Sequence, residues 1–300
     1  MSFHADDMGA TPTVTERICV AWEHGLLDGF SVFGNCDHPD LLSSRLASSP
    51  TRPARIAVHL NLWEGRPVSP VVDVPCLVDR SGFFNLDFAG VLRRVQVGRP
   101  RQSRTIFLAD VEREWRAQIE AVLGMIWPRR PTALDGHLHM HMVPSLFGLA
   151  VRLAADYNIP EIRIVREPFY LSRSTRHTRS KRFLVNCVKR ELLCRFAEIN
   201  ASTADNAGLG SPDRMIGLLY SGMMSRANIA PGIAASRRQG ARRIELLLHI
   251  GRADASELGR WNGNKSKASF VMSPHRDFEY EELIKMRGGL AADWHRRQAS

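Results

Sequence analysis

The stretch Arg55-Ile56-Ala57-Val58-His59-Leu60-Asn61-Leu62 indicates how this chain folds. It is a short apolar run followed by the turn-forming residues 63–67, which is typical of a buried strand. Similar short runs occur before and after it in the sequence, at residues 29–34, 132–135, 161–165 and 243–250, with helical patterns between them. Strands that alternate with helices predict a mainly parallel sheet, either open or closed into a barrel.

The helical patterns cover residues 13–27, 110–127, 144–157 and 181–197. Thr11 is suited to cap the first of these helices, and Pro12 is suited to its first position. Residues 65–105 and 171–240 are the least regular parts, apart from the helix at 181–197, and we expect loops or insertions there. Because no internal repeat or low-complexity linker divides the chain, the pattern predicts a single α/β domain.

Composition narrows the class of protein. The chain has 300 residues, of which 44% are apolar and 24% charged, as in soluble globular proteins. It contains no run of about 18 apolar residues and no secretory signal pattern, so we expect a cytoplasmic protein without a membrane span. Its five cysteines lack CxxC spacing, which favours free thiols over disulfides or a cysteine-type zinc site.

The net charge of +10 has two interpretations. Basic residues concentrate at 93–104 and 172–190, and clustered positive charge attracts phosphates, including those of anionic lipids. The alternative, which we favour, is an arginine-rich solvated surface. No helix-turn-helix, zinc-finger or RNP pattern accompanies the charge, so a nucleic-acid partner is not expected.

A histidine cluster stands at Asp135-Gly136-His137-Leu138-His139-Met140-His141. If this segment is extended, the three alternate imidazoles share one face and the apolar residues point to the other. Imidazoles beside a carboxylate are what a divalent metal site needs. A histidine-rich surface turn is the alternative, but the flanking apolar residues favour a strand that leaves the core.

Other ligand-type residues fall at predicted strand ends. Asp6 and Asp7 follow a short apolar start, and His59, His137 and His249 each lie at or just after a predicted strand. In a parallel barrel, the carboxyl ends of the strands converge on one mouth, where catalytic residues gather. Each histidine alone is consistent with a hydrogen-bonded core residue, but together they favour one shared site.

Four segments, taken in order, resemble the YdjC-like carbohydrate deacetylases. They are the opening His4-Ala5-Asp6-Asp7-Met8-Gly9, the strand Val58–Leu62 with Gly65-Arg66-Pro67, the histidine cluster continued to Pro144, and Glu245–His249. The resemblance implies a distorted (β/α) barrel of mainly parallel strands over residues 1–290, with residues 291–300 as a C-terminal tail. It also implies metal-dependent removal of an N-acetyl group from an amino sugar.

The resemblance further implies roles for single residues. Asp7, His59 and His137 correspond to the metal ligands, Asp6 to the general base and His249 to the general acid.

Other residues are implied to bind substrate: His139, His141, Arg163 and Arg166. An arginine here is expected either to hold the Asp base ionised or to bind a substrate oxygen, with a surface ion pair as the alternative. His4 stands where the family commonly has Asn, and it is expected either to change the bonding around the Asp pair or to add a ligand.

The implied cofactor is a divalent metal ion, with Zn²⁺ or Mg²⁺ first among several that such ligands accept. The implied substrate is an N-acetylated sugar, either free or attached to a lipid. A different metallohydrolase on the same scaffold is the alternative enzyme. A basic protein that binds glycans or anionic lipids around a structural metal is the alternative without catalysis. A homodimer is the default assembly.

Overall fold

The core of the protein is a parallel sheet. The computed structural model describes residues 1–48, 54–96, 100–172 and 181–298. Seven strands lie in the order β5-β4-β3-β2-β1-β7-β6, and every described pairing is parallel. The strands are β1 (Ser2–Met8), β2 (Gly29–Phe33), β3 (Arg55–Leu60), β4 (Ala133–Gly136), β5 (Glu161–Ile162), β6 (Arg214–Ile216) and β7 (Ile244–Leu248).

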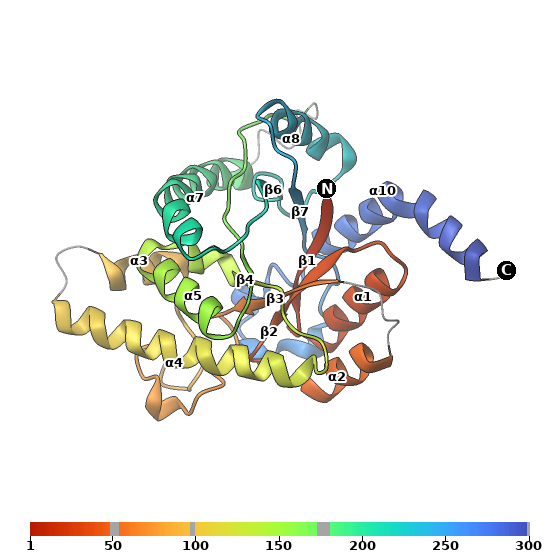
Figure 1. Ribbon diagram of the computed structural model, residues 1–300. Helices are drawn as coiled ribbons and strands as arrows, with labels where there is room; N and C mark the ends of the chain where they lie inside the picture. Colours follow the sequence, from red (N-terminus) through yellow and green to blue (C-terminus); the bar gives the residue numbers. More distant parts are fainter. Residues whose placement is uncertain (49–53, 97–99, 173–180, 299–300) are drawn as a thin grey trace.

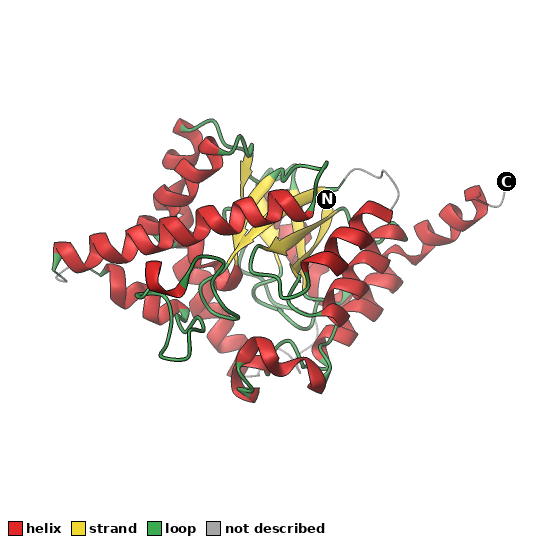
Figure 2. Ribbon diagram, turned by 90° about the horizontal axis from the view of Figure 1, so that it is seen from below, coloured by secondary structure: helices red, strands yellow, loops and turns green. Residues whose placement is uncertain are grey.

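The sheet curls into a half-barrel that helices surround (Figures 1 and 2). Backbone hydrogen bonds link its two edge regions: the amide of Ile162 donates to Gly210 (2.9 Å) and that of Met215 to Arg166 (3.1 Å). All five residues of β2 and all five of β7 are buried, as expected for strands covered on both faces. The predicted single-domain, distorted (β/α) barrel is confirmed.

Nine α-helices and three 3₁₀ helices are described. They are α1 (Pro12–Glu23), α2 (Pro39–Ser48), η1 (Val71–Asp73), α3 (Phe88–Val95), α4 (Arg101–Met125), η2 (His137–Met142), α5 (Pro144–Asp156), α7 (Lys181–Asn206), α8 (Arg226–Arg238), η3 (Ala255–Trp261), α9 (Lys265–Ala268) and α10 (His275–Gln298). The predicted start of α1 is confirmed, because the Thr11 side chain accepts from the amide of Val14 (3.2 Å). The predicted boundary at residue 290 falls within α10 and stays a prediction.

The expectation of irregular structure at 65–105 and 171–240 is wrong in part. These ranges contain α3, the first turn of α4, β6 and α8, and the helix expected at 181–197 continues to Asn206 as α7. The N-cap of α3 is Asp87, whose side chain accepts from the amide of Gly90. This cap was not predicted from the sequence. The strand β6 has only three residues, too few to show a periodic pattern. Residues 173–180 lie outside the described part of the chain.

Two further expectations agree with the structure. The five cysteines are free. No described helix is both long and apolar enough to cross a bilayer.

The helix α4 packs tightly against the ends of β2 and β3. Its Gln118 side chain accepts from the amide of Asn61 (2.9 Å) and donates to the carbonyl of Asn61 (2.8 Å). Gly34 permits this approach, because a Cβ at that position would lie 2.4 Å from the carbonyl oxygen of Gln118.

We therefore expect Gly34→Ala to reduce the free energy of unfolding by about 1–3 kcal/mol, since the backbone of α4 must move. Gly124→Ala, in the same helix, is the control: no atom lies within 4 Å of its added Cβ. That variant should gain about 0.5–1 kcal/mol. Urea unfolding measures both, and an unchanged midpoint for Gly34→Ala would contradict the packing described.

Candidate active site

Two adjacent carboxylates at the end of β1 begin the site. Neighbouring side chains of a regular strand point to opposite faces, yet Asp6 and Asp7 both line the same cavity. The strand register shifts between Ala5 and Met8, and Asp7 has φ 74°, in the left-handed region that non-glycine residues rarely adopt. This local bulge directs both carboxylates towards the carboxyl ends of the strands.

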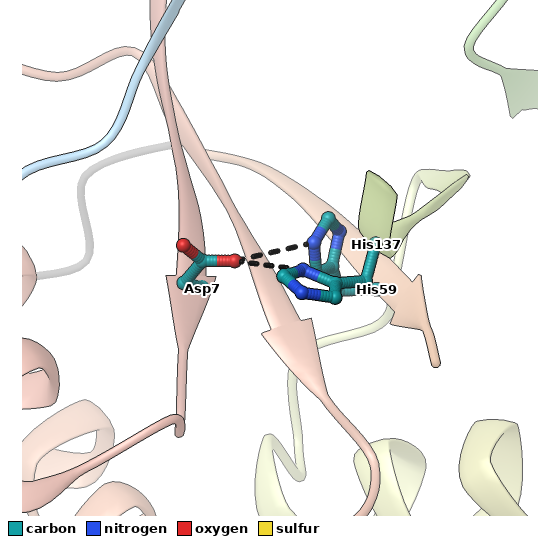
Figure 3. Close-up of side chains that lie close together, drawn as sticks. All are labelled: Asp7, His59 and His137. Carbon is teal, nitrogen blue, oxygen red and sulfur yellow. Dashed lines mark ion pairs between the residues drawn. The ribbon is translucent and has the colours of Figure 1, made fainter. Parts of the chain in front are cut away.

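Asp7, His59 and His137 form a compact group (Figure 3). Oδ1 of Asp7 lies 3.5 Å from Nε2 of His59 and 3.2 Å from Nδ1 of His137. The three candidate ligand atoms lie within 4.8 Å of one another. The ring of Phe33 packs edge-on against both imidazoles and fixes their planes. The predicted ligand set is therefore brought together.

The hydrogen bonding of this group fits a divalent cation. Oδ1 of Asp7 is buried and has no hydrogen-bond partner, whereas its Oδ2 accepts from Arg276 (2.9 Å). Nδ1 of His59 bonds Oδ1 of Asp135 (2.7 Å), so its Nε2 faces the group. A carboxylate behind a histidine is the usual outer partner of a metal ligand. One carboxylate and two imidazoles suit Zn²⁺ and related ions.

Charges around the group keep its carboxylate ionised. Burial raises the pKa of Asp7, but Arg276 and the two imidazoles outweigh it and hold the pKa well below its usual range. Burial likewise lowers the pKa of His59, but Asp6 and Asp135 overcome it and raise the pKa to about 10. The site thus concentrates negative charge that a cation would compensate.

A fully buried arginine lies beneath the site. The guanidinium of Arg163 donates two bonds to Asp6 (both 2.9 Å) and one to Glu245 (2.7 Å), and it pairs with Asp135 (2.9 Å). Arg163 does not line the cavity. Its two hydrogen bonds orient the carboxylate of Asp6 from below.

His4 belongs to this lower layer. Its Nε2 lies 2.7 Å from the hydroxyl of Ser31, which in turn lies 2.5 Å from Oδ2 of Asp135 and 3.0 Å from Oδ1 of Asp6. His4 therefore acts on the bonding around the Asp pair and does not join the group of Asp7.

The histidine cluster is not extended, and the expectation of three imidazoles on one face is wrong. Residues 137–142 form the 3₁₀ turn η2, in which Leu138 (φ 54°) and His139 (φ 59°) adopt left-handed conformations. The turn separates the rings: His137 reaches Asp7, His139 lines the cavity, and buried His141 donates to the carbonyl of Arg163 (2.8 Å).

His249 faces the same cavity from the end of β7. Its amide donates to Glu279 (2.6 Å), which also accepts from the amide of Gly222 (2.6 Å). Nδ1 of His249 is buried without a hydrogen-bond partner, and burial lowers the pKa of this residue to about 4. Its imidazole is therefore neutral near pH 7.

The cavity has a volume of about 200 Å³. Its floor contains Asp6, Asp7, His59, His137 and His249, and its walls include Trp63, Phe270 and three residues of α7. The site residues predicted from strand ends thus meet at one mouth. His141, Arg163 and Arg166 do not line the cavity, and their predicted contact with substrate stays a prediction.

Several residues of the site were not predicted from the sequence. Asp135 was visible next to the histidine cluster, but nothing assigned it to His59. Arg276 and Glu279 lie on α10, more than 265 positions after Asp7, and no local pattern marked them.

The chain was compared with known proteins. Residues 1–285 match the sequence model of the family described as YdjC-like protein. A carbohydrate deacetylase of Enterococcus faecalis is 30% identical over 164 residues, 52% of this chain and 55% of that protein. A chitooligosaccharide deacetylase of Serratia marcescens is 25% identical over 259 residues, 85% and 83% of the two chains. The chain spans only 55–63% of the length of the E. faecalis, Oceanobacillus iheyensis and Geobacillus stearothermophilus deacetylases.

A solved structure supports the fold. The crystal structure of an Enterococcus faecalis protein assigned to cellobiose-phosphate cleavage superposes with a TM-score of 0.61. The match covers 96% of this chain and 94% of that one at 24% identity. At this identity the similarity shows the architecture alone.

The Arg163 network predicts a large effect on stability. Arg163→Gln leaves buried carboxylates without their cation, and we expect it to cost about 3–5 kcal/mol of unfolding free energy. The control is Arg252→Gln, because Arg252 pairs with Asp277 on the surface. That change should stay within about 0.5 kcal/mol. Equal midpoints in urea for the two variants would contradict the role assigned to Arg163.

The same network predicts an acid transition. Burial raises the pKa of Glu245, but Arg163 and Arg55 outweigh it and lower the pKa to about 2. The folded pKa lies below the unfolded value of about 4.3, so this stabilisation is present above that pH and is lost as pH falls towards 2. Arg163→Gln should show a smaller loss over this interval when unfolding is followed against pH.

Proposed function

The chain belongs to the YdjC-like family, and from this premise we propose that it is a metal-dependent carbohydrate deacetylase that hydrolyses the N-acetyl group of an amino sugar. The observation that carries the proposal is the group of Asp7, His59 and His137 on the floor of a cavity, with Asp6 and His249 beside it. The names of the curated relatives agree with this activity.

In this proposal, Asp7, His59 and His137 hold a divalent ion, with Zn²⁺ or Mg²⁺ as the first candidates. When bound, such an ion lowers the pKa of water from 15.7 to as little as about 7 and polarises the acetamido carbonyl. Three protein ligands rather than four are typical of a catalytic site, because positions remain open for water and substrate.

Asp6 is the proposed general base. Arg163 fixes its carboxylate with two hydrogen bonds, so the group is oriented before substrate arrives. Oδ1 also lies 3.0 Å from the hydroxyl of Ser31, so a second lone pair on Oδ2 is the one that remains to accept the proton of the attacking water.

His249 is the proposed general acid. Burial keeps its imidazole neutral near pH 7, so in this role it would receive a proton that the attacking water releases and give it to the departing amine. Each of these proton transfers typically contributes about 10²–10⁴-fold to the rate.

The proposed substrate is an N-acetylated sugar. The cavity offers the ring of Trp63 and the unpartnered Nδ1 of buried His139 beside the catalytic group. An indole face is suited to the apolar face of a pyranose, and a ring nitrogen is suited to a hydroxyl.

The first experiment measures acetate release from N-acetylated glycans, including diacetylchitobiose and a lipid-linked amino sugar. Each is incubated with Zn²⁺, with Mg²⁺ and with a chelator. We expect release that the chelator abolishes and added metal restores. Absence of release from every glycan, with metal demonstrably bound, would reject a deacetylase acting on these sugars.

Variants separate the roles of the two aspartates. Asp7→Asn should lose bound metal and activity together, whereas Asp6→Asn should retain metal and lose about 10²–10⁴-fold in turnover. Asp277→Asn, a surface aspartate paired with Arg252, is the control and should change neither. Loss of metal from Asp6→Asn would show that the roles are assigned wrongly.

The carboxylate behind His59 gives a further prediction. Asp135→Asn removes the charge that orients the imidazole, so metal affinity measured by calorimetry should fall about 10–100-fold. Asp156→Asn, on the surface beside Arg116, provides the control. Unchanged affinity in Asp135→Asn would exclude His59 as a ligand.

A further inference from the structure

The two histidines of the proposed metal group present different ring nitrogens to Asp7. His59 presents Nε2, 3.5 Å from Oδ1 of Asp7, whereas His137 presents Nδ1, at 3.2 Å (Figure 3). A neutral imidazole binds a metal ion through its unprotonated nitrogen and carries its proton on the other nitrogen. Each ring therefore needs an acceptor for that proton on the side away from the ion.

Each imidazole has a carboxylate beside the nitrogen that does not face Asp7. For His59 it is Asp135, whose Oδ1 lies 2.7 Å from Nδ1. For His137 it is Glu64, whose Oε2 lies 3.8 Å from Nε2 and is the one carboxylate within 4 Å of that nitrogen among the described residues. This distance exceeds that of a hydrogen bond, so the contact is electrostatic. Glu64 thus takes the same place behind His137 that Asp135 takes behind His59.

The carboxylate of Glu64 is buried and held in one orientation. Its Oε1 accepts from Nε of Arg260 (3.2 Å), and its Oε2 accepts from the indole of Trp261 (2.8 Å). Both donors are buried and belong to η3. A carboxylate oxygen has two lone pairs, so Oε2 retains one after its bond to Trp261. The side chain cannot turn away from His137 without breaking a buried hydrogen bond.

The turn that carries Glu64 is fixed to the ends of two strands. Its carbonyl accepts from the side chains of Asn35 (2.9 Å) and Asn61 (2.7 Å), which follow β2 and β3. Arg260 joins the same network by donating to the carbonyl of Asn35 (2.7 Å). A buried network in which each group has a partner is rigid. Glu64 is therefore oriented by the sheet before any ligand arrives.

Two other roles for Glu64 fit the geometry less well. A fourth ligand would share the ion with Nδ1 of His137, but Glu64 lies beside the opposite nitrogen of that ring. The group whose candidate ligand atoms lie within 4.8 Å of one another, among the described residues, does not include it. A role as an anchor for η3 alone explains the bonds to Arg260 and Trp261, but not why Oε2 faces His137.

We propose that Glu64 is the positioning residue of His137. Its carboxylate stabilises the proton on Nε2, which leaves Nδ1 unprotonated for the ion. The two histidines then bind through different nitrogens, and each is supported by its own buried carboxylate. This inference rests on the metal group of the proposed function, and it extends that function by assigning the support of the second histidine.

The first test is calorimetric titration of the full chain with Zn²⁺ after a chelator has removed bound metal. Glu64→Gln keeps the size of the side chain and removes its charge, so we expect metal affinity to fall about 10–100-fold. Glu114→Gln is the matched control, because Glu114 is also a buried carboxylate that holds the segment after β3, through the amides of Val68 (3.0 Å) and Ser69 (2.9 Å). Its affinity for Zn²⁺ should be that of the native chain.

Unchanged affinity in Glu64→Gln would overturn the inference. An equal loss in Glu64→Gln and Glu114→Gln would do the same, because the effect would then come from general disturbance of the segment after β3.

A second test holds even if Glu64→Gln folds poorly, because it uses the native chain. Nuclear magnetic resonance spectra that correlate ring protons with ring nitrogens show which nitrogen of each imidazole carries the proton. In the Zn²⁺-loaded protein, we expect the proton on Nε2 of His137 and on Nδ1 of His59. A proton on Nδ1 of His137 would contradict the role of Glu64.

Acetate release separates this inference from the proposed activity. Weaker metal binding by Glu64→Gln, with no acetate released from any glycan by the native chain, would reject the deacetylase and leave the role of Glu64 standing. Acetate release by the native chain, with native metal affinity in Glu64→Gln, would reject the role of Glu64 and leave the activity standing.

Discussion

The site depends on one buried cation shared by three buried carboxylates. Arg163 binds Asp6, Asp135 and Glu245, which come from β1, the end of β4 and β7. Burying that many charges is costly unless each is paired and hydrogen-bonded. The guanidinium meets this condition, because its planar fork supplies donors in fixed directions. Through the resulting network, the strands of the sheet support the proposed catalytic groups.

The network reaches the group of Asp7, His59 and His137 through Asp135. Asp135 connects Arg163 to Nδ1 of His59, and Asp6 lies next to Asp7 on the bulged strand. The residues that hold the proposed ion are therefore oriented by the same contacts that orient the proposed base. On the other side, Glu279 holds the backbone of His249. The proposed ligands, base and acid are thus held by residues beneath them and beside them, at the bottom of the cavity.

Much of this arrangement could be predicted from the sequence, for physical reasons. Short apolar runs identify buried strands, and parallel strands bring their carboxyl ends together, so Asp7, His59, His137 and His249 were placed correctly. The histidine cluster was misjudged because alternation has meaning only in an extended segment, and Leu138 and His139 adopt left-handed conformations. Arg276 and Glu279 were not predicted, because their contacts with Asp7 and His249 arise only when the polar helix α10 packs against the sheet. The strand β6 and the start of α4 were not predicted, because neither has a pattern of apolar residues long enough to show a helix or strand period.

The position of β1 has a consequence for how the protein is made. This first strand lies between β2 and β7, and the Asp7 carboxylate is completed by Arg276, 269 positions later. During synthesis the N-terminal strand therefore has only one of its two neighbours until nearly the whole chain has left the ribosome. The contact between Asp7 and Arg276 forms last, and a chain that ends before α10 has the strands of the sheet but lacks this contact. Assembly of the centre in this way needs α10 as well as the strands of the sheet.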